Sequence, residues 1–313
     1  MSIQEKKAEF EKQYKVYESV KLRFTGVDGF DVYNCSIPFT WNGREYIYGR
    51  VEKRDEWARS WVMLFEKTGE DEYALVKGHM IYQLEDPYIA VIGNELTLGG
   101  THVRKRSGKI DTYYGYFYRG SDINDLVYFT TGPDEMKDIR LVDMKDGRIG
   151  VFSRPRNDEI LEKYGSASMI GFTVIGDLND LTDEVILNAK PIEGIFDKGE
   201  WGGCNQAYML QNGNIGIIGH QSYADETGGE KLAVYLNVSF EFNPDTFEVS
   251  NKKVIGTRMC YPEGPAKLSY LADCTFTSGI VVRGDGKADL YGGLGDTAEG
   301  RIVIDYPFNA PIK

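Results

Sequence analysis

Pairs of polar residues recur along the chain sixteen positions apart, and their side chains are of kinds that transfer protons and bind anions. The pairs are Asn34 with Arg50, Asp86 with His102, Asp138 with Arg154, and Cys204 with His220. A carboxyl group can act as a general acid or base, and a guanidinium group binds carboxylate or phosphate through two parallel hydrogen bonds. If the fold brings these pairs together, they form a site for acid–base chemistry beside bound anions.

The segment between the members of each pair has the pattern of a β-hairpin. In "DPYIAVIGNELTLGGTH", which begins at Asp86, two alternating apolar runs flank a Gly-Asn turn, and the other segments carry Asn-Gly or Asp-Gly there. Such turns between β-rich runs are the strongest local hairpin signal. The first residue of a hairpin and the last residue of its partner strand lie side by side, so each pair meets at the open end.

The hairpins belong to a longer repeat. The segments that start at Asn34, Asp86 and Asp138 begin 52 residues apart, and a stretched fifth copy starts at Asp273. This spacing leaves room for two further strands per copy, as in a propeller blade of four strands. The sequence therefore predicts an all-β, five-bladed β-propeller over residues 21–313 as a single catalytic domain, with the polar starting residues at one mouth of the channel.

Residues 1–20 differ from the remainder of the chain. They are rich in Glu and Lys, and Phe10, Tyr14 and Tyr17 recur at helical spacing. We expect a short amphipathic helix that packs on the propeller or on a second subunit, and the second case would make the protein a homo-oligomer.

Composition excludes several classes of protein. A net charge of −12 argues against a nucleic-acid partner, because phosphate backbones require a clustered positive face. No run reaches the roughly 18–20 apolar residues of a membrane span, and the charged N-terminus does not match a secretory signal. The cysteines lack CxxC spacing, so we expect no metal site, reduced thiols and a cytoplasmic location. No phosphate loop or dinucleotide fingerprint is present, so we expect no cofactor.

Three of the hairpin segments resemble successive blades of a known family. "LEDPYIAVIGNELTLGGTH", "KDIRLVDMKDGRIGVFSRP" and "GGCNQAYMLQNGNIGIIGHQSY" resemble the second, third and fourth blades of the mannoside phosphorylases and hydrolases of glycoside hydrolase family 130. "YGGLGD" stands where that family has a Tyr-Gly-Ala-Ala-Asp ending. The resemblance is closer still to a bacterial branch of this five-bladed class.

The resemblance implies a carbohydrate-active enzyme that cleaves a glycosidic bond of an oligosaccharide or glycoside, with Asp86 as the general acid. It also implies phosphate ligands, which by position would be Arg50, Lys137, Arg154 and His220. Because Tyr88 replaces an arginine of the family motif, we favour inverting hydrolysis. The first alternative is phosphorolysis of a β-mannoside with inorganic phosphate. The second alternative is a non-catalytic carbohydrate-binding propeller.

Inverting hydrolysis needs a second carboxyl group about 6.5–9.5 Å from the acid. Asp138, Asp273 or Glu263 could supply it, and Glu263 in "YPEGPAKL" resembles the Glu-Gly-Pro acid motif of families 43 and 62. Further candidate ligands of substrate or phosphate are Asn34, Glu85, His102, Trp201 and Asn205. We expect "EWGGCNQ" to be a mouth loop from which Trp201 projects towards a sugar.

The same residues also admit purely structural roles. Asp86 before Pro87 could simply open a strand, because Asp-Pro favours turns. Arg154 could form an ion pair with Asp138 at the blade mouth, which is compatible with a substrate contact. His102 and His220 could be structural histidines.

Overall fold

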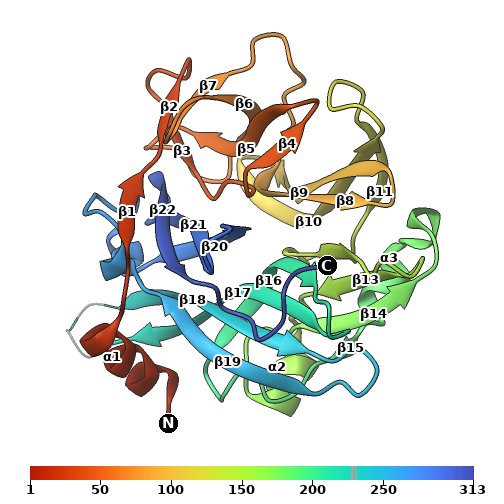
Figure 1. Ribbon diagram of the computed structural model, residues 1–313, viewed down its shortest axis with the longest axis vertical. Helices are drawn as coiled ribbons and strands as arrows, with labels where there is room; N and C mark the ends of the chain where they lie inside the picture. Colours follow the sequence, from red (N-terminus) through yellow and green to blue (C-terminus); the bar gives the residue numbers. More distant parts are fainter. Residues whose placement is uncertain (227–228, 230) are drawn as a thin grey trace.

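The computed structural model describes residues 1–226, 229 and 231–313, and its strands form five sheets around a common axis (Figure 1). Four sheets contain four strands and one contains six. The prediction of a five-bladed β-propeller is confirmed.

The blades follow one another along the chain. Blade 1 contains β2 (Arg23–Thr25), β3 (Asp31–Tyr33), β4 (Phe39–Trp41), β5 (Arg44–Glu52), β6 (Trp61–Gly69) and β7 (Glu72–Leu75). Blade 2 contains β8 (Glu85–Ile92), β9 (Glu95–Arg106), β10 (Lys109–Gly120) and β11 (Val127–Thr131). Blade 3 contains β12 (Arg140–Asp143), β13 (Ile149–Ser153), β14 (Gly171–Ile175) and β15 (Lys190–Pro191), with helices α2 (Asp158–Tyr164) and α3 (Asp183–Leu187) between its strands. Blade 4 contains β16 (Trp201–Met209), β17 (Ile215–Asp225), β18 (Leu232–Phe242) and β19 (Val249–Gly256).

Blade 5 is completed by the other end of the chain. It contains β20 (Thr275–Val282), β21 (Lys287–Leu294) and β22 (Ala298–Asp305), and β1 (Glu18–Lys21) pairs antiparallel with β22 as its outermost strand. The buried guanidinium of Arg301 holds the closure together, because it binds Glu18 on β1, Asp289 on β21 and Asp71 of blade 1. The first and last blades are thereby tied into a ring.

The N-terminal helix is present but shorter than the sequence predicted. Helix α1 (Ile3–Gln13) begins with a capping box between Ser2 and Glu5 and ends where Tyr14 turns extended, with a ψ of 147°. Residues 18–21 belong to the sheet instead of to this helix. Buried Ile3 packs with Leu236 and other apolar residues of blade 4, so α1 packs on its own propeller.

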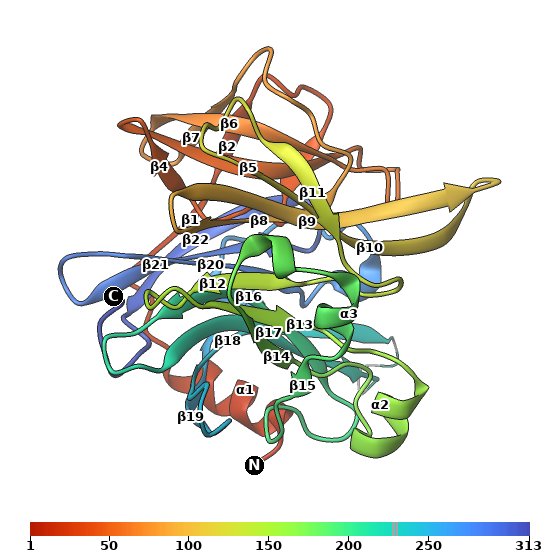
Figure 2. The same ribbon diagram turned by 90° about the vertical axis from the view of Figure 1, so that its right-hand side faces the viewer.

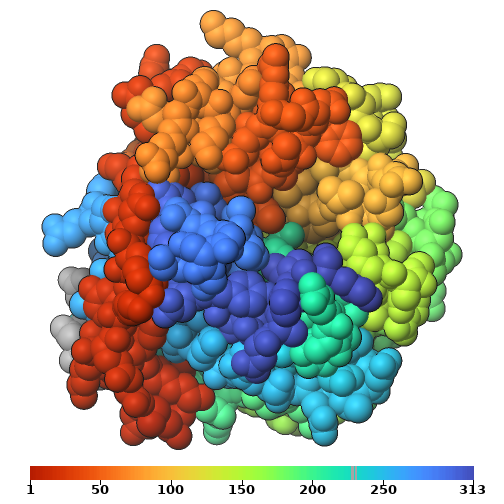
Figure 3. Space-filling model, in the orientation of Figure 1, coloured from red at the N-terminus to blue at the C-terminus, as the bar shows by residue number. Residues whose placement is uncertain are grey.

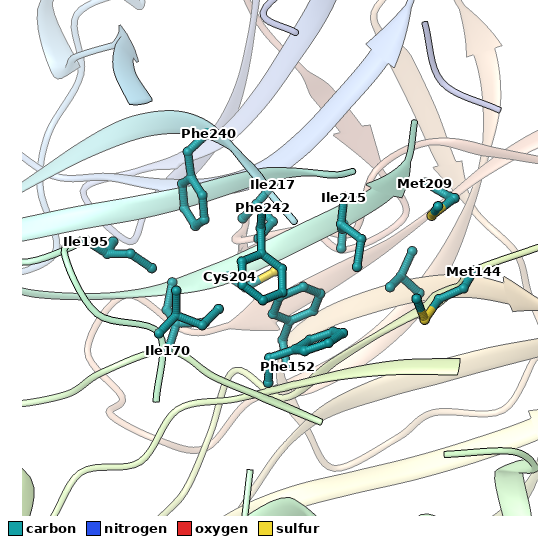
Figure 4. Close-up of a cluster of buried hydrophobic side chains, with 14 residues drawn as sticks. Met144, Phe152, Ile170, Ile195, Cys204, Met209, Ile215, Ile217, Phe240 and Phe242 are labelled. Atoms are coloured by element: carbon teal, nitrogen blue, oxygen red, sulfur yellow. The ribbon is translucent and has the colours of Figure 1, made fainter. Parts of the chain in front are cut away.

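The core consists of apolar layers between neighbouring blades. Figure 4 shows one such layer, in which Phe152 of blade 3 lies against Ile215, Ile217 and Phe242 of blade 4. The rings of Phe152 and Phe242 meet edge to face with centroids 6.1 Å apart. Alternation along each strand sends the apolar residues into these layers, and the strand ends are left to carry polar groups.

The two ends of the channel differ. The C-terminal segment crosses the face seen in Figure 3, where Ile312 bridges to Leu210 in the hairpin turn of blade 4. The tip of the β9–β10 hairpin projects on the opposite side (Figure 2). Among the described residues, no helix is long and apolar enough to cross a membrane.

Candidate active site

A cavity of about 540 Å³ opens at the end of the channel where the inner strands begin. Every blade contributes to its wall; the contributors include Arg50, Asp86, Arg154, His220 and Asp296, from blades 1 to 5 in that order. The volume lies in the range of about 300–1,000 Å³ typical of small-molecule sites. Residues far apart in the sequence therefore converge in one pit, and Asp86 and Arg154 open into the same cavity.

Four polar residues at this end share an unusual backbone conformation. Asn34, Asp86, Asp138 and Asp296 have φ values of 46°, 48°, 58° and 58°. Asn and Asp are the side-chain-bearing residues that best tolerate this left-handed region, and such strain is concentrated at functional sites. In blade 2 a register shift between Glu85 and Tyr88 accompanies it, and bulges of this kind re-aim a side chain.

The Asp86 carboxylate is held by one of its oxygens. Its Oδ1 accepts hydrogen bonds from Asn34 Nδ2 at 3.0 Å and from Arg50 Nη1 at 2.9 Å. No donor among the described residues reaches Oδ2. Asp86 is only 3 % exposed, yet it lines the cavity. One oxygen is therefore fixed by the protein, and the other remains for a ligand.

Cationic groups with open hydrogen-bonding positions lie on blade 3. The Nη1 of Arg154 donates to Asp138 at 2.6 Å and its Nε donates to the Gly202 carbonyl at 2.7 Å, whereas its Nη2 has no partner in the described part of the chain. Lys137 lines the cavity and has no ion-pair partner among the described residues. Burial opposes its charge, but Asp138 and Asp86 outweigh burial and raise the pKa of Lys137. These groups suit a multiply charged anion.

His220 of blade 4 is a neutral imidazole. Burial, together with the nearby Arg154, lowers the pKa of His220 to about 3. Its Nδ1 lies 2.8 Å from Asn205 Oδ1, and an amide oxygen only accepts, so Nδ1 carries the proton. The buried Nε2 has no hydrogen-bond partner within the described residues, although the side chain lines the cavity. It is available to a ligand hydroxyl.

The carboxyl groups of the wall lie on different blades from Lys137, Arg154 and His220. Besides Asp86, the wall carries Glu85 on blade 2 and Asp296 on blade 5, which flank blade 1. Burial raises the pKa of Glu85 and of Asp296, Arg50 opposes this shift, and the negative charge of Asp86 adds to it. Lys137, Arg154 and His220 lie on blades 3 and 4, which face blade 1 across a ring of five. A ligand in the cavity therefore meets Arg50 and the carboxyl groups on blades 1, 2 and 5, and Lys137, Arg154 and His220 on blades 3 and 4.

Two expected catalytic acids lie elsewhere. Asp273 binds Lys7 of helix α1 at 3.1 Å and does not line the cavity. The acid that blade 5 presents is Asp296, which sequence reasoning missed, although it ends the "YGGLGD" segment. Glu263 is exposed on the loop after β19 and lines two other surface hollows. Neither carboxyl group therefore lines this cavity.

The candidate ligand His102 does not line the cavity. Glu85 pairs with Thr101 in the ladder, so alternation puts Thr101 and Val103 on the cavity wall and turns His102 away. Its Nδ1 lies 3.1 Å from the Gln83 carbonyl oxygen. The two-residue turn of this hairpin shifts the register relative to the longer turn of blade 3.

The segment "EWGGCNQ" is a strand, whereas the sequence led us to expect a loop. Trp201 begins β16 and still lines the cavity, where its Nε1 donates to Tyr235 at 3.3 Å. A Cβ on Gly203 would lie 3.1 Å from His220 Cε1 and 3.3 Å from Arg154 Cδ. The glycine therefore lets these two side chains close over the strand.

Two predicted residues lie behind the wall. Asp138 is 2 % exposed and does not line the cavity; it binds Arg154 and lies 3.6 Å from Arg140. Burial favours its neutral form, but Arg154, Lys137 and Arg140 outweigh burial and lower the pKa of Asp138. A carboxylate held in this way positions Arg154 and is a poor base. Asn205 supports His220 in the same manner.

The rim of the cavity carries apolar residues that the sequence did not single out. Trp57, Ile110 and Tyr270 line it and remain 46 %, 46 % and 39 % exposed. They come from a loop of blade 1, the β9–β10 hairpin and the loop before β20. Because no repeat marks these positions, only the fold reveals them.

The comparisons define the class of protein. The chain belongs to the family described as "Protein of unknown function (DUF1861)", whose model matches residues 8–310. No curated protein matches the chain significantly. The expected class, a carbohydrate-active enzyme built on a five-bladed propeller, is confirmed by two solved relatives of about half identity.

Among the solved structures, a mannose phosphorylase from Leishmania mexicana in complex with phosphate ion is 52% identical with a TM-score of 0.94, covering 99% of this chain and 96% of its own. A GDP-Man-dependent mannosyltransferase from the same organism is 48% identical with a TM-score of 0.92, covering 100% and 97%. A β-1,2-mannobiose phosphorylase from Listeria innocua shares the fold at 14% identity and a TM-score of 0.65, covering 89% and 91%.

Proposed function

We propose that the protein is a mannoside phosphorylase that cleaves a β-mannoside with inorganic phosphate. The observation that carries the proposal is a cluster of cavity groups that have no partner among the described residues, the Lys137 ammonium, Arg154 Nη2 and His220 Nε2, on blades 3 and 4. Lys137 lies close enough to Asp86 of blade 2 for their charges to interact. A phosphate ion would satisfy all three, because its charged oxygens accept from the cations and its hydroxyl donates to the imidazole. The 52% identical relative that was solved with phosphate supports the same anion here.

The geometry suggests a single displacement. Phosphate held by Lys137 and Arg154 attacks the anomeric carbon and forms the new C–O bond. Asp86 Oδ2 gives its proton to the glycosidic oxygen as the old C–O bond breaks. The products are mannose 1-phosphate with inverted configuration and the sugar that leaves with the transferred proton. In the reverse direction, the Asp86 carboxylate takes the proton from the acceptor hydroxyl.

Hydrolysis is less well supported than the sequence suggested. Asp86 and Asp296 both accept from Asn34 Nδ2, at 3.0 and 3.3 Å, so they lie on the same side of the cavity. An inverting hydrolase needs its second carboxylate on the opposite face of the sugar, with room for water. The Tyr88 argument also loses its force, because Tyr88 is 2 % exposed, does not line the cavity, and packs under Arg140 at 4.7 Å.

Mannosyl transfer from GDP-mannose is the second candidate, favoured by the 48% identical transferase. The same cations would stabilise a departing diphosphate, and Asp86 would deprotonate the acceptor. The rival reading of a non-catalytic carbohydrate-binding propeller predicts no turnover in either reaction.

One assay separates these candidates. The protein is incubated with β-mannosides with and without inorganic phosphate, and with GDP-mannose plus a mannoside acceptor. Phosphate-dependent release of mannose 1-phosphate is the expected result. Phosphate-independent release of mannose would establish hydrolysis instead, and consumption of GDP-mannose alone would establish transfer.

The Asp86→Asn variant tests the role of the acid. Because general acid catalysis contributes about 10²–10⁴-fold, we expect turnover to fall by about that factor while phosphate binding persists. Asp273→Asn is the matched control and should retain activity, because Asp273 lies outside the cavity. Full activity in Asp86→Asn would contradict the assignment.

A further inference from the structure

A buried carboxylate lies outside the cavity and directly behind Arg50. Glu52 is 0 % exposed, and it accepts hydrogen bonds from Tyr33 Oη at 2.6 Å, from the Arg59 backbone N–H at 2.7 Å and from Ser60 Oγ at 3.1 Å. Lys267 forms an ion pair with the same carboxylate. Such a fully buried charge needs this degree of compensation.

Glu52 is also a competitor for Arg50. The Nη2 of Arg50 lies 3.6 Å from Glu52 and donates to Glu85 at 3.1 Å, while its Nη1 donates to Asp86 at 2.9 Å. The guanidinium also lies over the Tyr33 ring at 4.8 Å. Arg50 therefore interacts with the buried Glu52 and with the two cavity carboxyl groups, Glu85 and Asp86.

Lys267 reaches this point from another part of the ring. It lies in the loop between β19 and β20, and its backbone N–H donates to the Gly295 carbonyl at 2.7 Å, next to Asp296. Its side chain is 2 % exposed, and its Nζ also donates to the Lys53 carbonyl at 3.1 Å. The residue is thereby fixed at both ends, between the turn of Asp296 and the support of Arg50.

We propose that Lys267 is a positioning residue of the active site, which neutralises Glu52 so that Arg50 remains available to Glu85 and Asp86. Lys267 does not line the cavity and touches no substrate. It acts through Glu52 and Arg50 on the ionisation of Asp86. The inference rests on the proposed function, in which Asp86 exchanges a proton with the glycosidic oxygen.

The charges around Asp86 determine the direction in which each substitution shifts its ionisation. Among the described residues, the groups that face Asp86 are Asn34, Arg50, Glu85, Lys137, Cys274 and Asp296. Without Lys267, the negative charge of Glu52 interacts more strongly with Arg50. Arg50 then stabilises the Asp86 anion less, and Asp86 takes up a proton at higher pH. Loss of the Glu52 charge has the opposite effect. Loss of both charges restores the balance.

The experiment compares Lys267→Met, Glu52→Gln and the double variant through the pH dependence of kcat/KM for β-mannoside phosphorolysis. We expect the limb that reports Asp86 to move up by about 0.5–1 pH unit in Lys267→Met and down in Glu52→Gln. The double variant and Lys267→Arg should lie near the wild type. Shifts of the same sign in both single variants, or no shift, would overturn the proposal, because a merely structural role predicts no opposite signs.

Two measurements keep the outcome decisive. Thermal melts show whether Lys267→Met folds. If it does not, the direction of the pH shift in Glu52→Gln tests the proposal alone. If the wild type releases no sugar phosphate, the proposed function fails separately. Carbon-13 NMR titration of the aspartate carboxyl groups then tests the same opposite shifts at Asp86 without turnover.

Discussion

Unpartnered polar atoms gather on one side of the cavity wall. A buried polar group without a partner costs about 1–3 kcal/mol, and more when it is charged. His220 Nε2, Arg154 Nη2 and the Lys137 ammonium remain open within the described residues, while His220 Nδ1 and the other two nitrogens of the Arg154 guanidinium are hydrogen-bonded. A site that is preorganised in this way recovers the cost when its ligand binds.

Lys137→Met should therefore weaken phosphate binding selectively. We expect the KM for phosphate to rise at least about tenfold, because a charge-assisted contact contributes roughly 1.5–3 kcal/mol, with a smaller effect on the KM for the mannoside. Initial rates at varied phosphate measure the change. Lys145→Met, on an exposed turn where Lys145 pairs with Asp143, is the control. Equal effects of the two substitutions would contradict a phosphate contact at Lys137.

Glu299 gives the fold a pH dependence of its own. Burial raises the pKa of Glu299 from its ordinary 4.5 to about 8, against hydrogen bonds from the Cys35 N–H and Ser278. In the unfolded chain, the Glu299 carboxyl group releases its proton at lower pH than in the folded protein. The contribution of Glu299 to the free energy of unfolding therefore falls as pH rises from about 4.5 to 8, by up to about 1.4 kcal/mol per pH unit.

Glu299→Gln removes this titration. Its free energy of unfolding relative to wild type should increase between pH 5 and 8, as measured by urea denaturation at several pH values. Glu263→Gln, on an exposed loop, should show no such trend. A constant difference across this range would show that Glu299 is ionised in the folded protein.

At the scale of elements, hairpin turns were predictable and strand phase was less so. The Asn-Gly, Gly-Asn and Asp-Gly turns located the inner hairpins, because these dipeptides fit tight turns. The sixteen-residue spacing between paired residues does not bring His102 to the cavity, because a shorter turn shifts the register of that hairpin. In blade 5, Asp296 lines the cavity instead of Asp273. Helix α1 was placed too long, because the amphipathic pattern continues into β1 while the backbone becomes extended after Gln13.

Ring closure through β22 gives a prediction at the same scale. Arg301 is 4 % exposed and is surrounded by the carboxylates of Glu18, Asp71 and Asp289. Arg301→Met leaves Asp71 without its ion-pair partner and leaves Glu18 and Asp289 with Arg283. We expect the free energy of unfolding to fall by about 3–5 kcal/mol. Arg283→Met, whose half-exposed side chain meets Glu18 and Asp289, should cost under about 1 kcal/mol. Comparable losses in denaturant melts would contradict this view of the closure.

At the scale of the whole molecule, the two ends of the channel differ. The C-terminal segment lies at the far end, where the Lys313 N–H donates to the Met209 carbonyl at 2.8 Å. We expect substrate and product to use the mouth lined by the starting residues, where the cavity opens. The β9–β10 hairpin and the rim residues Trp57 and Tyr270 stand at this entrance.

We propose that helix α1 is dispensable for the ring and that strand β1 is not. Deletion of residues 2–13 should leave a folded enzyme with a lower melting temperature, because the packing of Ile3 and Phe10 and the Lys7–Asp273 pair are lost. Deletion of residues 2–21 removes the outer strand of blade 5 and exposes an open sheet edge, which favours aggregation. Size-exclusion chromatography and thermal melts distinguish the two, and equal behaviour would refute the division.

The positive φ values of Asn34, Asp86, Asp138 and Asp296 restrict what random mutagenesis can return at these sites. Backbone geometry there favours glycine, asparagine and aspartate, so a saturated library screened only for foldedness should already be enriched in amides and carboxylates. New specificities selected from this scaffold should therefore arise at the rim, where Trp57, Ile110 and Tyr270 are free to vary.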